Sequence, residues 1–154
     1  MLFADEPTSC VDASLAKSIV ESMYSIAERG TTVLCTIHQP ASHLFEKFDK
    51  LLLLAQGQVV YFGNRLDAYE YFAYKLNRAC QLNYNPADHY INVTAIRPED
   101  IEGTTKEVRG YCEKFQTSQI YADVHDYVHA LPEERINNSK KQWNTPPFFT
   151  GCCL

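Results

Sequence analysis

The stretch that decides the fold is Met1-Leu-Phe-Ala-Asp5-Glu6-Pro7-Thr8-Ser9-Cys10-Val11-Asp12, in which a short apolar run stops at two adjacent carboxylates. The run predicts a buried strand that brings Asp5 and Glu6 to the edge of a sheet, where ligands bind in open α/β sheets. Asp5 suits Mg²⁺, a hard cation that prefers carboxylate oxygen. Glu6 is a candidate to orient or deprotonate a water molecule. The alternative interpretation is a buried strand that ends in an acidic turn.

The residues that follow predict a helix and a second strand. Apolar residues between positions 13 and 29 recur at helical spacings, and the β-branched run 31–37 is typical of a buried strand that ends at His38. A right-handed crossover would bring Asp5, Glu6 and His38 to the same sheet edge. A lone histidine after a strand is usually unremarkable, but this position makes His38 a candidate to donate a hydrogen bond to a phosphate oxygen.

The rest of the chain divides into segments of different pattern and polarity. It predicts a short helix over 41–48, a hairpin of strands over 50–55 and 59–62, and helices over 66–76 and 85–96. The aromatic residues of 66–76 are expected in the core. From Arg97 the chain is polar, with helix-compatible segments at 105–116 and 118–130, and residues 143–154 turn apolar and aromatic.

Composition narrows the class of protein. The chain has 154 residues, of which 45% are hydrophobic and 21% charged, as in an ordinary soluble globular protein. Its net charge of −5 argues against nucleic acid as the main partner. No window approaches the roughly 18 to 20 apolar residues of a membrane span. Six scattered cysteines without a C-x-x-C pair suit free thiols in the cytosol.

The motif D-E-P-T-S-x-x-D after an apolar strand resembles the Walker B motif and D-loop of ATP-binding cassettes, and His38 resembles their switch histidine, or H-loop. The resemblance implies that Glu6 and His38 are catalytic, and that Asp5 binds Mg·ATP, its Mg²⁺ held through water. It also implies that Asp12 couples the two cassettes of a dimer, although Asp12 can equally serve as a helix N-cap. Ser9 and Gln39, in the same two loops, are candidate nucleotide-binding residues.

Further segments narrow this resemblance to the White/ABCG family of half-transporters. They are Thr36-Ile-His-Gln-Pro40, Gly57-Gln-Val-Val-Tyr-Phe-Gly63, Tyr71-Phe72 and Asn85-Pro-Ala-Asp88. The resemblance implies an α/β fold, a partial P-loop NTPase (ABC cassette) fold with parallel strands and a terminal hairpin, followed by a mainly helical polar linker. The expected divisions are the C-terminal half of a nucleotide-binding domain over 1–96, the linker over 97–142, and the start of a truncated connector to a membrane domain over 143–154.

The resemblance also implies a function. The parent protein is expected to couple ATP hydrolysis, with ATP and Mg²⁺ as cofactors, to transmembrane export or transport of a lipid, sterol or small molecule. The expected partners are a second cassette, in a homo- or heterodimer, and a transmembrane domain, with no nucleic acid. The parent would lie at the cytosolic face of a membrane, and this chain alone would be cytosolic or peripheral.

Two motifs of the family do not occur in the sequence. Neither a Walker A loop, G-x-x-x-x-G-K-[ST], nor the Ser-Gly-Gly-rich signature loop is found. Because phosphate binding depends on such a loop, the chain alone is expected to bind ATP very weakly and to hydrolyse none. Two alternatives stay open: a non-enzymatic module that pairs with an intact cassette, and a soluble cassette protein of DNA repair or translation. The second predicts a coiled coil or a second cassette, and the sequence has neither.

Overall fold

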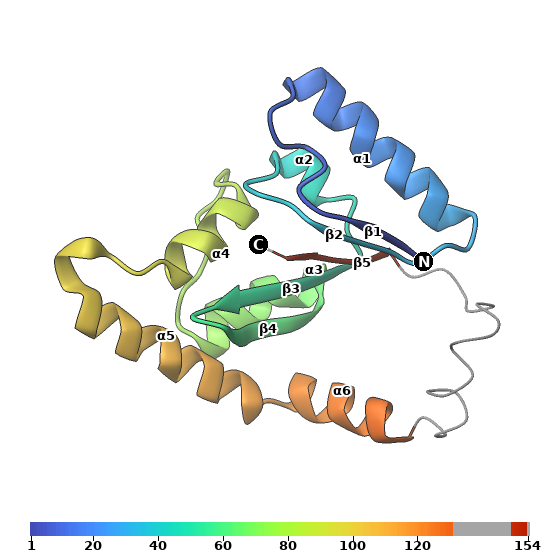
Figure 1. Cartoon of the computed structure of the whole chain (residues 1–154). Coiled ribbons are helices and arrows are strands. Elements are labelled where there is room, and N and C mark those ends of the chain that lie inside the picture. Colours follow the sequence, from blue (N-terminus) through green and yellow to red (C-terminus); the bar gives the residue numbers. More distant parts are fainter. Residues whose placement is uncertain (131–148, 154) are drawn as a thin grey trace.

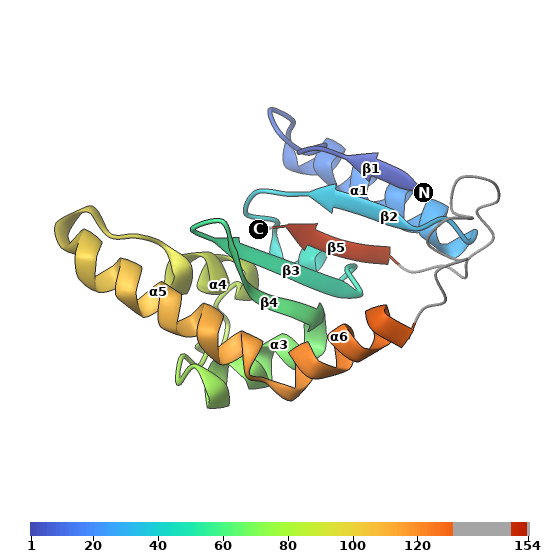
Figure 2. The same ribbon diagram turned by 60° about the horizontal axis from the view of Figure 1, so that its bottom comes forward.

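The computed structural model describes residues 1–130 and 149–153, the latter as backbone only. A single sheet has the strand order β1-β2-β5-β3-β4. Its strands are β1 (Leu2–Ala4), β2 (Val33–Thr36), β5 (Phe149–Cys153), β3 (Lys50–Ala55) and β4 (Gln58–Asn64). The first four in this spatial order are parallel, and β4 runs antiparallel to β3. Figure 2 shows the five strands side by side.

The predicted strand–helix–strand unit at the start of the chain is confirmed. Helix α1 (Ala13–Glu28) connects β1 to the parallel strand β2. Its buried residues Val20, Met23 and Ala27 lie three and four positions apart, as an amphipathic helix on a sheet requires. Gly30, with φ of 94°, ends the helix in a conformation that glycine adopts without steric cost. The ends of β1 and β2 therefore lie at the same sheet edge.

The predicted hairpin is also confirmed, and it contains a bulge that the sequence did not reveal. Leu53 pairs with Tyr61, but the next residue, Leu54, pairs with Val59, so that Val60 is the extra residue of β4. A bulge of this kind lets two residues at an odd spacing face the same side of a sheet. Leu51 and Leu53 are buried on the core side, where they contribute to the central hydrophobic cluster.

The hairpin leads into a series of helices. These are α3 (Arg65–Glu70), a turn of π-helix η1 (Tyr71–Lys75), α4 (Pro86–Thr94), a 3₁₀ turn η2 (Pro98–Asp100), α5 (Ile101–Gln116) and α6 (Gln119–Ala130). The short helix α2 (Ser42–Phe45) precedes the hairpin. Figure 1 shows α5 and α6 running along the β4 side of the molecule, opposite α1.

Only part of the predicted aromatic stripe lies in the core. Tyr71 and Phe72 are buried and pack edge to face on each other, whereas Tyr69 and Tyr74 are exposed. Tyr69 lies in α3, whereas Tyr71, Phe72 and Tyr74 lie in the π-helical turn η1. Burial raises the pKa of the Tyr71 hydroxyl well above its usual range.

The predicted polar helices over 105–116 and 118–130 correspond to α5 and α6, of which α5 begins four residues earlier. Helix α5 buries Val108, Tyr111, Cys112 and Phe115. The prediction of a connector over 143–154 falls largely outside the described residues. Within it, residues 149–153 form β5, a strand that the sequence did not predict.

The predicted P-loop NTPase fold is wrong. In the part of the chain that the structure describes, helices account for far more residues than the small sheet.

Candidate functional site

Thr36 holds together the two strand ends that the sequence singled out. Ala4 of β1 pairs with Cys35 of β2. The residues that follow this last pair, Asp5 and Thr36, therefore lie next to each other. The Thr36 hydroxyl donates to Asp5 Oδ1 at 2.6 Å and accepts from the Glu6 backbone N–H at 2.8 Å. We call Asp5, Glu6, Thr36 and His38 the strand-end site. Sequence reasoning gave Thr36 no role of its own.

A tight turn after β1 sets the direction of the Glu6 side chain. Glu6 has a φ of 42°, and its carbonyl accepts from the Ser9 N–H at 3.0 Å. The Ser9 hydroxyl also donates to Glu6 Oε2 at 2.8 Å. A positive φ at a residue other than glycine is strained and is found most often at functional sites. Asp5 and Glu6 are adjacent in sequence but have different hydrogen-bond partners, and both are exposed.

Asp12 caps helix α1. Its Oδ1 accepts from the N–H groups of Ser14 at 2.8 Å and Leu15 at 2.9 Å. This is the N-cap role that the sequence analysis gave as the alternative for this residue. The second carboxylate oxygen has no partner within residues 1–130, and the residue is exposed, so the cap leaves one oxygen of Asp12 accessible to a partner.

His38 and Gln39 lie in the loop after β2, and both are exposed. Gln39 has a φ of 44°, a positive value like those of Glu6 and Cys10 in the loop after β1. Within residues 1–130, neither side chain hydrogen-bonds to Asp5 or Glu6, so the structure places His38 at the same edge as the carboxylates without joining them directly. This arrangement leaves the imidazole accessible to a ligand.

The segment Asn85-Pro-Ala-Asp88 is hydrogen-bonded to the loop that contains His38. The Asn85 side chain caps α4 by accepting from the Ala87 N–H at 3.2 Å, and its Nδ2 donates to the Pro40 carbonyl at 2.9 Å. One side chain thus fixes both the start of a helix and the position of the loop that follows His38. The sequence predicted the start of a helix at this segment but not its contact with Pro40, because a contact across 45 positions has no local signal.

The strand-end carboxylates fit a magnesium ion held through water. The Thr36 hydroxyl donates to Asp5 Oδ1 and so orients the carboxylate, and Asp5 is exposed. Oriented carboxylate oxygen that faces solvent is the ligand type that Mg²⁺ uses when it keeps several of its waters. The described residues contain no cluster of three or more metal-ligating side chains.

A second polar network joins the segment after η1 to α5. The Arg78 guanidinium contacts both Glu107 and the Tyr111 hydroxyl, and Tyr111 donates to Glu107 Oε1 at 2.5 Å. Hydrogen bonds from Tyr111 and Arg78 hold the pKa of the Glu107 carboxyl below its usual range. The network links the segment after η1 to α5 and includes none of the strand-end residues, so we assign it a structural role.

Among the described residues, no helix combines the length and hydrophobicity of a membrane span.

Cys35, Cys80 and Cys112 are buried free thiols, whereas Cys10 is exposed. Burial raises the pKa of the Cys80 and Cys112 thiols, which makes them poor nucleophiles.

Comparison with known proteins gives both a family and close relatives. The family model described as ABC-2 type transporter matches residues 38–142. Protein white of Drosophila melanogaster is 41% identical over 125 residues, which cover 80% of this chain and 18% of that protein. ABC transporter G family member 11 of Arabidopsis thaliana is 40% identical over 137 residues, 84% of this chain and 19% of that protein.

A third relative carries a more explicit name. ABC transporter ATP-binding protein/permease wht-1 of Caenorhabditis elegans is 38% identical over 124 residues, which cover 80% of this chain and 18% of that protein. The chain therefore spans about a fifth of the length of the curated relatives it matches.

These matches agree with the predicted resemblance to White/ABCG transporters. They do not support the further expectation that the chain is the C-terminal part of a nucleotide-binding domain, because the matched family is that of the ABC-2 membrane domain. The same match overturns the predicted partial P-loop NTPase fold.

Proposed function

The chain belongs to the ABC-2 type transporter family, and from this premise we propose that its strand-end site acts on Mg·ATP within a White/ABCG-type transporter. The phosphate-binding loop would come from other parts of that transporter. The parent protein would lie in a membrane and couple ATP hydrolysis to export or to transport of a lipid, sterol or small molecule.

One observation carries this proposal: two adjacent carboxylates at one sheet edge have different hydrogen-bond partners, since the Asp5 carboxylate accepts from the Thr36 hydroxyl and the Glu6 carboxylate from the Ser9 hydroxyl. Two acids with different partners can serve two roles. Asp5, held by the Thr36 hydroxyl, would bind the magnesium ion through water. Glu6, held by the turn to Ser9, would orient and deprotonate the attacking water.

The remaining predicted residues take supporting roles. His38 would donate to a γ-phosphate oxygen, with the position of its loop maintained by Asn85. Ser9 and Gln39 would contact the nucleotide or its waters from the same two loops. ATP with Mg²⁺ supplies the phosphoryl group, and the side chains of this chain bind, orient and accept a proton.

Asp12 would face a partner half-transporter. It is exposed at the start of α1, where one carboxylate oxygen caps the helix and the other remains accessible. ABCG half-transporters function with a partner half, and this second subunit would complete the nucleotide site. The relative wht-1 is named an ABC transporter ATP-binding protein/permease, and this name supports a role in nucleotide binding.

A graft tests the proposal. The matching region of wht-1 is replaced by this chain, and ATP hydrolysis is measured with purified protein. Glu6→Gln should lower the hydrolysis rate by a factor on the order of 10² or more, because it removes the proposed general base. Glu28→Gln, an exposed glutamate at the far end of α1, is the matched control and should leave the rate unchanged. Equal rates in the two variants would refute the role of Glu6.

A further inference from the structure

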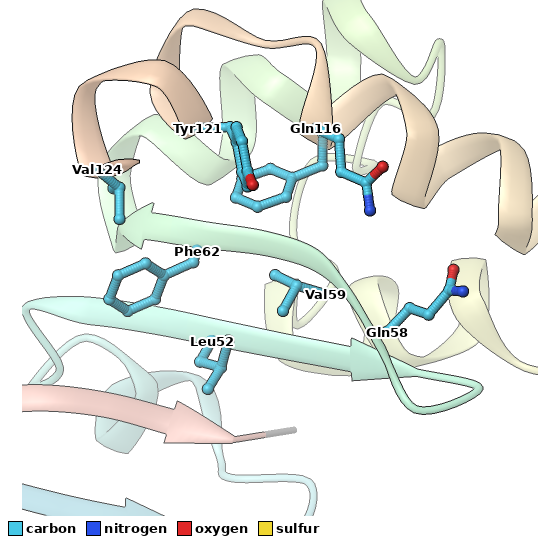
Figure 3. Close-up of a pocket in the computed structure, with 8 residues that line it drawn as sticks. Leu52, Gln58, Val59, Phe62, Gln116, Tyr121 and Val124 are labelled. Atoms are coloured by element: carbon cyan, nitrogen blue, oxygen red, sulfur yellow. The ribbon is translucent and has the colours of Figure 1, made fainter. Parts of the chain in front are cut away.

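A pocket of about 430 Å³ lies between the β3–β4 hairpin and the junction of α5 with α6. Figure 3 shows Leu52, Val59 and Phe62 on the hairpin side, and Tyr121 and Val124 of α6 on the opposite side. The volume is within the roughly 300–1,000 Å³ of small-molecule sites. None of the four residues of the strand-end site lines the pocket, and nothing in the proposed function uses it.

The bulge in β4 creates one wall of this pocket. Val59 and Phe62 are three residues apart and would face opposite sides of a regular strand. Because Val60 is the extra residue, Val59 opposes Leu54 and Phe62 opposes Leu52, so both reach the pocket side. Val59 and Phe62 are only partly buried, although they pack against the hydrophobic core. The wall is therefore apolar and accessible.

The helices supply an aromatic wall. Phe115 at the end of α5 and Tyr121 in the first turn of α6 pack edge to face, with ring centroids 5.7 Å apart. Phe115 is 3% exposed and is fixed by the core, whereas Tyr121 is 38% exposed. A fixed ring beside an exposed ring suits an aromatic ligand, because edge-to-face and offset stacking stabilise such contacts beyond their buried area.

The polar groups of the pocket lie at one end. Gln58 and Gln116 are at the end opposite Phe62 and Val124 (Figure 3), and no charged side chain of residues 1–130 lines the pocket. An ionised ligand would lose its hydration in such a pocket without gaining a counter-charge. A side-chain amide offers both a donor and an acceptor, and so complements a neutral carbonyl or amide group.

We propose that this pocket is a binding site for a neutral, flat, aromatic small molecule that has a carbonyl or amide group at one end. The rings lie between the Val59–Phe62 wall and Tyr121, and the polar group hydrogen-bonds to Gln58 and Gln116. Ligand binding joins α6 to the sheet, so occupancy also stabilises the α6 end of the molecule.

The test uses the full 154-residue chain and Nile red, a neutral fused-ring dye with a carbonyl group. Fluorescence titration should give one saturable site. Val124→Trp fills the pocket from α6 and should weaken binding by about tenfold or more, equivalent to about 1.4 kcal/mol. Val128→Trp places the same side chain one turn further along, where Val128 is exposed outside the lining, and should change the affinity by less than about twofold.

Two further measurements test the polar group and the neutral charge that the proposal assigns to the ligand. Gln116→Leu leaves the apolar walls intact and should weaken Nile red binding by about threefold to tenfold, through loss of one hydrogen bond. Anilinonaphthalene sulfonate, an anionic aromatic dye, should bind more weakly than Nile red. Circular dichroism of each variant checks folding, and Gln116→Leu serves if Val124→Trp does not fold. Absence of saturable binding, equal loss in the two tryptophan variants, or preference for the anionic dye would each overturn the proposal.

Discussion

Thr36 determines the geometry of the strand ends, because its hydroxyl is the one group that contacts both Asp5 and Glu6 within residues 1–130. As an acceptor it holds the Glu6 backbone, and as a donor it orients the Asp5 carboxylate. Its β-branched side chain also suits the last position of a strand. The same residue thus serves the fold and the proposed chemistry.

Replacing Thr36 by valine should therefore destabilise the chain by about 1 kcal/mol, the usual net contribution of hydrogen bonds at a partly exposed position. Valine keeps the shape and β-propensity and removes only the hydroxyl. Thr36→Ser keeps the hydroxyl and should recover most of the loss. Urea unfolding of the three proteins measures the difference, and a Thr36→Val chain as stable as the wild type would show that the bridge is energetically unimportant.

At the residue scale, the sequence predicted individual groups better than the contacts between them. Asp5, Glu6 and His38 could be picked out because each follows a strand, and the capping of α1 by Asp12 follows from a short acidic residue before a periodic run. Thr36 and Asn85 could not be assigned roles in this way. Their partners lie about 30 and 45 positions away, and such contacts follow only from the packing of complete elements.

At the element scale, the start of α4 is tied to the loop after β2. Asn85 caps the helix, Pro86 occupies the first helical position, and the Asn85 amide reaches the Pro40 carbonyl. A helix terminus and a loop are thus positioned by one side chain, which makes α4 a support for the His38 loop rather than a separate unit.

Asn85→Ala should cost about 2 kcal/mol, roughly 1 from the helix cap and 1 from the bond to Pro40. Asn85→Ser retains a capping oxygen but cannot supply the amide donor, so it should cost about half as much. Thermal or urea unfolding of both variants separates the two contributions. If the serine and alanine variants lose the same stability, the cap contributes nothing and the link to Pro40 accounts for the whole loss.

The Arg78–Glu107–Tyr111 network predicts a dependence of stability on pH. The pKa of the Glu107 carboxyl lies below its ordinary value of 4.5, so the folded state binds this proton less readily than the unfolded state does. The contribution of Glu107 is therefore present above the ordinary pKa. It is lost as the pH falls through the lowered pKa of the folded state.

Glu107→Gln should accordingly lower stability by roughly 1 kcal/mol at neutral pH, since the pair is partly exposed, and the gap to the wild type should close in acid. Urea unfolding from pH 7 to pH 3 measures the gap. Glu113→Gln, at an exposed position six residues further along α5, is the control and should show no comparable pH-dependent gap. A gap for Glu107→Gln that persists unchanged into acid would contradict this origin.

At the scale of the whole molecule, local patterns predicted most elements but not their complete assembly. Helical periodicity identified α1, and the turn Gln56-Gly57 between two apolar runs identified the β3–β4 hairpin. Strand β5 was missed because Phe149–Cys153 contains a glycine and lacks an alternating pattern, and its place between β2 and β3 depends on pairing with distant strands. The predicted P-loop NTPase fold was wrong. A motif of twelve residues can indicate a family without determining the fold of the whole chain.

The central claim is that Asp5 and Glu6 have separate roles toward Mg·ATP, and bound nucleotide measures this most directly. In the wht-1 graft, radiolabelled ATP retained with Mg²⁺ is compared between Asp5→Asn and Glu6→Gln. The proposal predicts that Glu6→Gln retains intact ATP at the wild-type level or above and releases little phosphate, whereas Asp5→Asn loses the Mg²⁺-dependent part of the binding. Equal retention and equal phosphate release in the two variants would contradict the account.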